Sequence, residues 1–81
     1  MNIQLIEGQF GTKEAIEIIT QMINVKVKYH EQKITQSSNE EDIKFREAKI
    51  KRLQKELHEF RTNLKNTEGK LTLHSIIKIE D

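Results

Sequence analysis

The apolar positions of this chain follow two different periods, and each period predicts a different kind of element. Near the N-terminus, Ile3 and Leu5 alternate with polar neighbours, which is the two-residue period of a strand over residues 2–7. Residues 71–80 alternate in the same way, with Ile76 as the exception on an otherwise polar face. Directly after the first strand, the closely spaced Gly8 and Gly11 predict a turn.

Between these strands, apolar residues recur every three or four positions, which predicts two long helices over residues 12–36 and 40–66. No glycine or proline interrupts either segment, and the polar loop 37–39 separates them. Thr12 is the expected N-cap of the first helix, and Ser38 or Asn39 is the expected N-cap of the second. The two helices should therefore form a hairpin.

The first predicted helix carries two adjacent apolar stripes that together cover roughly 200° of its circumference, about twice the usual width. One stripe is formed by Ala15, Ile18, Met22, Val25 and Tyr29, and the other by Ile16, Ile19, Ile23, Val27, His30 and Ile34. The second helix has a single stripe with heptad-like spacing. We therefore expect the first helix to need two partners and the second helix only one.

These elements predict an α+β fold, mostly α, in a single domain over residues 1–81 with the order β-α-α-β. A short loop makes the helices antiparallel, so the terminal strands are antiparallel too and can pair as a ribbon along one stripe of the first helix. A helix of about 24 residues is about 36 Å long and outruns such a ribbon. The hairpin tip around Tyr29, Ile34 and Ile43 should then stay half exposed in a single chain.

Length and composition add an expectation of self-association. A chain of 81 residues has a marginal core, and the absence of cysteine removes disulfides and cysteine-based metal sites as a remedy. We therefore expect a homodimer, and whether the strands pair within a chain or swap between chains stays open. The expected interface consists of Ile16, Ile19, Ile23, Val27, Tyr29, His30, Ile34, Ile43 and Phe45.

Charge weighs against a dedicated nucleic-acid or anionic-membrane binder. The chain has 14 Lys and Arg against 13 Asp and Glu, a formal net charge of +1, without the basic excess typical of such proteins. A basic cluster does run along the second helix, although acidic residues interrupt it and few aromatic residues offer a platform for stacking bases. The alternative function is therefore a small dimeric nucleic-acid-binding regulator using Lys44, Lys49, Lys51, Arg52 and Lys55.

The histidines are the remaining candidates for chemistry. His30, together with Lys26 and Lys33, interrupts an apolar face of the first helix. These three residues could form an anion site. The simpler interpretation is that the apolar stems of the lysines cover the edge of the apolar face while their charged ends reach solvent. In a hairpin that turns near Ser38, His30 should lie opposite about Glu47. No histidine begins an H-E-x-x-H motif, so we expect no metal, no cofactor and no catalytic residue.

The N-terminal residues show no basic leader followed by an apolar run, and no segment approaches the roughly 20 apolar residues of a membrane span. We therefore expect a cytoplasmic protein without a membrane partner. The function that the sequence predicts is a non-enzymatic interaction or structural module, a homodimer of helical hairpins, with a second copy or another protein as its partner.

Overall fold

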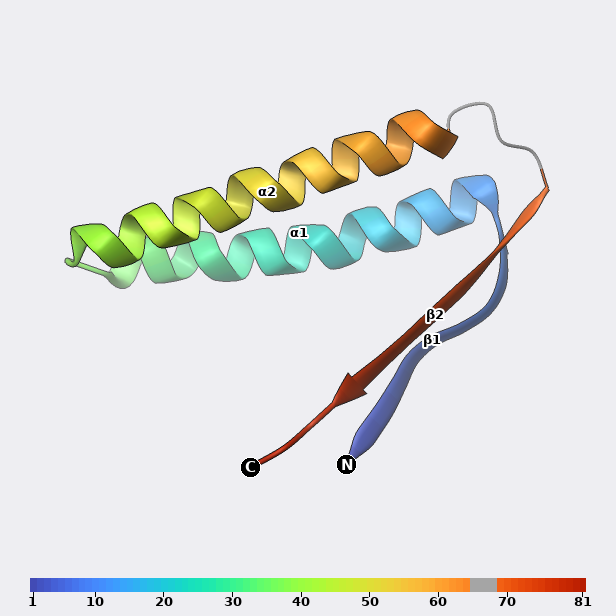
Figure 1. Ribbon diagram of the computed structural model, residues 1–81, viewed down its shortest axis with the longest axis horizontal. Helices are drawn as coiled ribbons and strands as arrows, with labels where there is room; N and C mark the ends of the chain where they lie inside the picture. Colours follow the sequence, from blue (N-terminus) through green and yellow to red (C-terminus); the bar gives the residue numbers. More distant parts are fainter. Residues whose placement is uncertain (65–68) are drawn as a thin grey trace.

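The computed structural model describes residues 1–64 and 69–81. Its elements are β1 (Asn2–Gly11), α1 (Thr12–Gln36), α2 (Glu40–Leu64) and β2 (Lys70–Lys78). The helices form an antiparallel hairpin, and the two strands pair as an antiparallel ribbon within the chain (Figure 1). The predicted fold class, mostly α with the order β-α-α-β, is confirmed.

The ends of α1 and the start of α2 agree with the prediction in position, but only one of the two predicted N-caps is present. Both bounds of α1 and the loop 37–39 agree with the prediction, whereas the predicted end of the second helix, residues 65 and 66, lies outside the described residues. Asn39 caps α2, because its Oδ1 accepts hydrogen bonds from the backbone N–H groups of Glu41 at 2.9 Å and Asp42 at 3.2 Å. Thr12 is not the N-cap of α1, since Gly11 occupies that position without a side-chain cap.

The predicted turn at Gly8 and Gly11 is wrong, because these residues continue β1. Gly8 pairs with Leu73, and Phe10 pairs with Leu71. Gly8 has a φ of +139°, which side-chain-bearing residues rarely adopt, so its conformational freedom serves an irregular strand and not a chain reversal. Strand β2 also begins one residue earlier and ends two residues earlier than the predicted 71–80.

A β-bulge decides which side chains share a face of the ribbon. The pairing shifts between Gln4 and Ile6, so one strand has an extra residue there. This shift places Ile3 and Ile6, three positions apart, on the same face. We call this the inner face; paired positions on it are Ile3 with Ile77, Ile6 with Ser75, Gly8 with Leu73, and Phe10 with Leu71. Ile76 lies on the opposite, outer face, paired with Gln4.

The ribbon contacts the hairpin only where they join, and then diverges from it (Figure 1). The molecule measures 47 × 33 × 13 Å, and its radius of gyration of 15.3 Å exceeds the value of about 12 Å for a compact chain of this length. The expected packing of the ribbon along a whole stripe of α1 is therefore wrong. Because β1 ends at Gly11 and α1 begins at Thr12, no connecting residues are available to fold the ribbon back.

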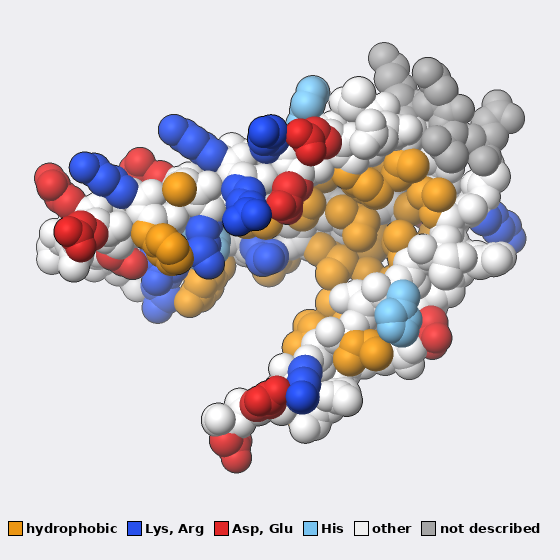
Figure 2. Space-filling view, viewed as in Figure 1, with side chains coloured by type: hydrophobic (Ala, Val, Ile, Leu, Met, Phe, Trp, Pro, Cys, Tyr) orange, Lys and Arg blue, Asp and Glu red, His pale blue; other side chains and the backbone are white. Residues whose placement is uncertain are grey.

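On the two apolar surfaces that diverge from this junction, burial falls with distance from it. Ala15 is 0% exposed and Ile18 and Met22 are half-buried, but Val25 and Tyr29, farther along the same stripe, are 68% and 51% exposed. The inner face of the ribbon shows the same gradient, half-buried at Phe10, Leu71 and Leu73 and exposed at Ile3 and Ile77. We call the space between these two apolar surfaces the open wedge; Figure 2 shows hydrophobic side chains on both of its walls.

Candidate functional site

His30 and Arg46 form the central contact between the helices. Arg46 Nη1 lies 3.1 Å from His30 Nδ1, and Arg46 Nε also donates to Asp42 Oδ2 at 3.2 Å. A guanidinium group can only donate, so Nδ1 of His30 must accept. The imidazole is therefore neutral and carries its hydrogen on Nε2. The residue opposite His30 is thus Arg46, one position from the predicted Glu47.

The surroundings of His30 favour this neutral form. Partial burial lowers the pKa of His30 below its ordinary value of 6.5, and the positive charges of Arg46, Lys49 and Lys26 lower it further. At neutral pH the ring is consequently an uncharged partner of Arg46.

The lowered pKa of His30 makes stability depend on pH. Because the unfolded chain binds the His30 proton more tightly than the folded chain, the free energy of unfolding should fall as the pH drops below 6.5 and level off below the folded pKa. Urea unfolding between pH 8 and 5 measures this slope. The variant His30→Gln keeps an acceptor for Arg46 but cannot titrate, so its slope should be shallower. Identical slopes in both proteins would contradict a lowered pKa of His30.

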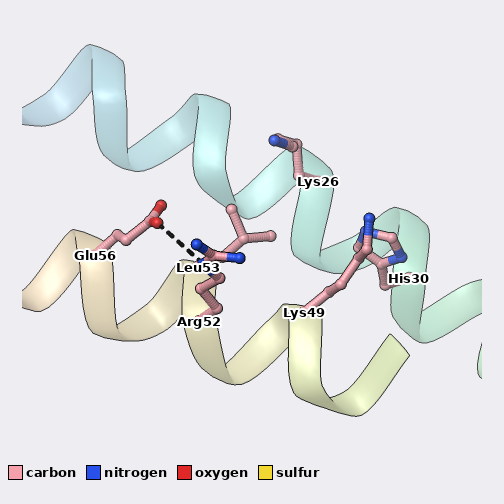
Figure 3. A pocket seen from close by; sticks show the side chains of 6 residues that line it. All are labelled: Lys26, His30, Lys49, Arg52, Leu53 and Glu56. Carbon is pink, nitrogen blue, oxygen red and sulfur yellow. Dashed lines mark ion pairs between the residues drawn. The ribbon is translucent and has the colours of Figure 1, made fainter. Parts of the chain in front are cut away.

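A small groove lies beside this contact, and we call it the basic groove. Its volume is about 230 Å³, and it is lined by Lys26, His30, Lys49, Arg52, Leu53 and Glu56 (Figure 3). Arg52 pairs with Glu56 at 3.6 Å, whereas neither Lys26 nor Lys49 forms an ion pair within residues 1–64 and 69–81. The groove therefore has an excess of positive charge.

The predicted trio of Lys26, His30 and Lys33 does not form one site. Lys26 and His30 line the basic groove, but Lys33 Nζ lies 5.8 Å from the centre of the Tyr29 ring. Arg46 lies at the same distance from that ring, and Tyr29 packs edge-on against His30 with their centres 5.4 Å apart. Lys33 thus packs on the aromatic side chain next to the groove.

The predicted nucleic-acid face lies only partly in the basic groove. All five of its cations are exposed, but only Lys49 and Arg52 line the basic groove. Lys44, Lys51 and Lys55 are spaced by seven and four positions and follow one line along α2. Arg52 is three positions from both Lys49 and Lys55, so it adjoins this line. Lys49 Nζ also lies 4.8 Å from the centre of the Phe45 ring. The cations thus adjoin one another, and Glu56, paired with Arg52, is a negative charge among them.

The residues predicted for the dimer interface differ in exposure. Val27 is buried within the hairpin at 8% exposure, and Tyr29 and Phe45 are more than half exposed. The half-buried members are Ile16, Ile19, Ile23, His30, Ile34 and Ile43.

Of the seven exposed large apolar residues that the described part of the chain has outside the predicted interface, three lie on the walls of the open wedge, namely Val25 of α1 and Ile3 and Ile77 of the ribbon. Their exposure results from the angle between ribbon and hairpin. Strand alternation alone does not predict that angle, so the sequence gives no signal that would single these residues out.

Two kinds of feature are absent from the described part of the chain. Within it, no group of three or more His, Cys, Asp or Glu side chains is arranged to hold a metal ion. Neither described helix combines the length and the apolar character needed to cross a bilayer.

The structure thus defines a helical hairpin with a diverging terminal ribbon, an open apolar wedge and a basic groove. No protein-family model, curated protein or solved structure matches the chain.

Proposed function

We propose that the protein is a non-enzymatic interaction module that works as a homodimer, in which a second copy covers the open wedge. The observation that carries this proposal is the lack of a closed core. Among the described residues only Ala15 and Val27 are buried, and no large side chain is fully buried. An isolated chain of this kind gains little hydrophobic stabilisation from folding.

The exposed area supports the same proposal. The chain exposes 6814 Å², whereas a folded monomer of 9.6 kDa exposes about 5100 Å². The excess is about 1700 Å² per chain, and a stable interface of standard size removes about 800 Å² from each partner. A standard interface would therefore remove about half of the excess, and an interface in the size range of obligate homodimers can remove all of it.

The shape of the wedge favours a second copy as its occupant. One wall is a helix stripe and the other is a ribbon face, so each chain carries both surfaces that the interface needs. A two-fold axis can place the ribbon of one chain against the helix stripe of the other, in the reciprocal manner of symmetric dimers. The net charge of +1 produces little repulsion between two copies.

Nucleic acid is the weaker alternative, because Arg52 already pairs with Glu56 and the chain has a formal net charge of only +1. Strong electrostatic binding requires several cations that contact the same phosphate backbone. The proposal of an interaction module does not depend on that cluster.

The mass in solution tests the proposal directly. Light scattering coupled to size exclusion, over a dilution series from about 100 μM to about 1 μM, should give the mass of two chains, as expected for a stable interface. A single-chain mass throughout the series would contradict the homodimer.

A further inference from the structure

The basic groove brings together like charges from two helices that are separate in sequence. Lys26 comes from α1, and Lys49 and Arg52 come from α2 (Figure 3). Like charges close to one another repel, although solvent weakens this repulsion because the three side chains are exposed. The carboxylate of Glu56 is already paired with Arg52, and the charges of Lys26 and Lys49 have no such partner within the described ranges. An anion in the groove would offset the repulsion.

The donors that line the groove suit a particular kind of anion. Each lysine offers three N–H donors around a compact charge, and Arg52 offers a planar fork. His30 is neutral because of its bond with Arg46, and it keeps Nε2–H as a further donor. A group with a charge close to −2 and several acceptor oxygens satisfies this set better than a carboxylate, which has one charge and two oxygens.

The size of the groove limits what else the ligand carries. Its volume of about 230 Å³ is below the roughly 300–1000 Å³ of pockets that enclose drug-sized ligands. Leu53 provides an apolar wall, and Glu56 contributes a negative charge on the same lining. The space therefore fits one small charged group, with any remaining part of the ligand outside in solvent.

We propose that the basic groove binds a phosphate group, either as inorganic phosphate or as the monoester group of a small molecule. Lys26 and Lys49 supply most of the attraction, and Arg52 and His30 donate further hydrogen bonds. The groove lies within one hairpin, so this site does not depend on the proposed homodimer. A negative result in the ligand titration would therefore contradict only the phosphate site, and a single-chain mass in solution would contradict only the homodimer.

An NMR titration at constant ionic strength tests the site. Inorganic phosphate should shift the His30 ring signals and the Lys26 and Lys49 side-chain signals along a saturable curve, and chloride should leave them nearly unchanged. Glycerol 1-phosphate is the second arm: tighter binding than phosphate would identify a monoester as the ligand, and weaker binding would identify inorganic phosphate itself. Shifts that do not saturate, or that chloride reproduces, would overturn the proposal.

A matched pair of variants separates a site from general attraction. Lys49→Gln removes a cation of the groove, and Lys55→Gln removes an exposed cation of the same helix outside it. Lys49→Gln should weaken phosphate binding about fivefold, which corresponds to the upper end of the interaction energies of ion pairs near a protein surface. Lys55→Gln should weaken it by less than about twofold. Both positions are exposed, and equal helical circular dichroism confirms intact folding. Equal losses in the two variants would show that no defined site exists.

Discussion

Replacing Ile77 by glutamate should convert the protein from a dimer to monomers over the micromolar range. Ile77 lies on the inner face of the ribbon, paired with Ile3, and is 43% exposed in the single chain. An unpaired carboxylate buried in an apolar interface costs about 3 kcal/mol or more, which raises the dissociation constant by about 100-fold. Light scattering over the same dilution series as for the unmodified chain measures the change.

Ile76 provides the matched control, because it is the next residue and lies on the outer face at 52% exposure. Ile76→Glu introduces the same charge into the same strand, yet it should leave the mass of two chains unchanged. If both variants remained dimeric, the interface would not include the inner face of the ribbon. If both variants dissociated equally, the effect of the charge would not depend on which face of the ribbon carries it. Either result would contradict the placement of the second copy in the wedge.

A second large effect is expected at Ala15, where replacement by leucine should lower the midpoint temperature of thermal unfolding by several degrees. Ala15 is 0% exposed at the junction of α1 with the ribbon, so no space is available for a larger side chain. Overpacking of this kind costs about 1–3 kcal/mol, and each kcal/mol corresponds to about 4–8 °C in a domain of this size. Thermal unfolding followed by circular dichroism, at one fixed protein concentration, measures the shift.

Ala48 is the control for this substitution, because it is an exposed alanine in the middle of α2. Ala48→Leu makes the same change without filling an occupied space, so its midpoint should stay within about 2 °C of the parent. Equal midpoints for the two variants would mean that the junction tolerates a larger residue. The ribbon would then be only loosely attached to the hairpin.

The parts of the fold that the sequence predicts well are those with a strong local signal. The long three- and four-residue period and the polar break at Ser37–Asn39 are sufficient to place α1 and the start of α2. The continuation of β1 through Gly8 is not predicted, because glycine more often marks a turn than an irregular strand. The angle of the ribbon depends on the backbone at Gly11, which a pattern of apolar positions does not encode.

The basic groove illustrates a different limit of prediction from the sequence. Sequence spacing groups His30 with Lys26 and Lys33 because all three lie on one helix, but the two charges that lower the pKa of His30 most, Arg46 and Lys49, come from α2. The antiparallel pairing that places Arg46 beside His30 also brings Lys49 and Arg52 to Lys26, one turn away. Applying the hairpin pairing to every cation of α1 would have revealed this convergence. The lengths and positions of the helices already contained that signal.

The ribbon also has a consequence for the order in which the chain folds. Its strands flank the hairpin, and the backbone N–H of Ile79 bonds to the carbonyl of Met1, 78 positions away in sequence. Closing so long a loop carries an entropic cost that the hairpin, with its short loop 37–39, avoids. Once the helices have paired, the strands start from neighbouring points and can zip together from the junction outward. Pairing near Gly11 therefore comes early and pairing near Met1 comes last, so the free end of the ribbon is also where unfolding starts.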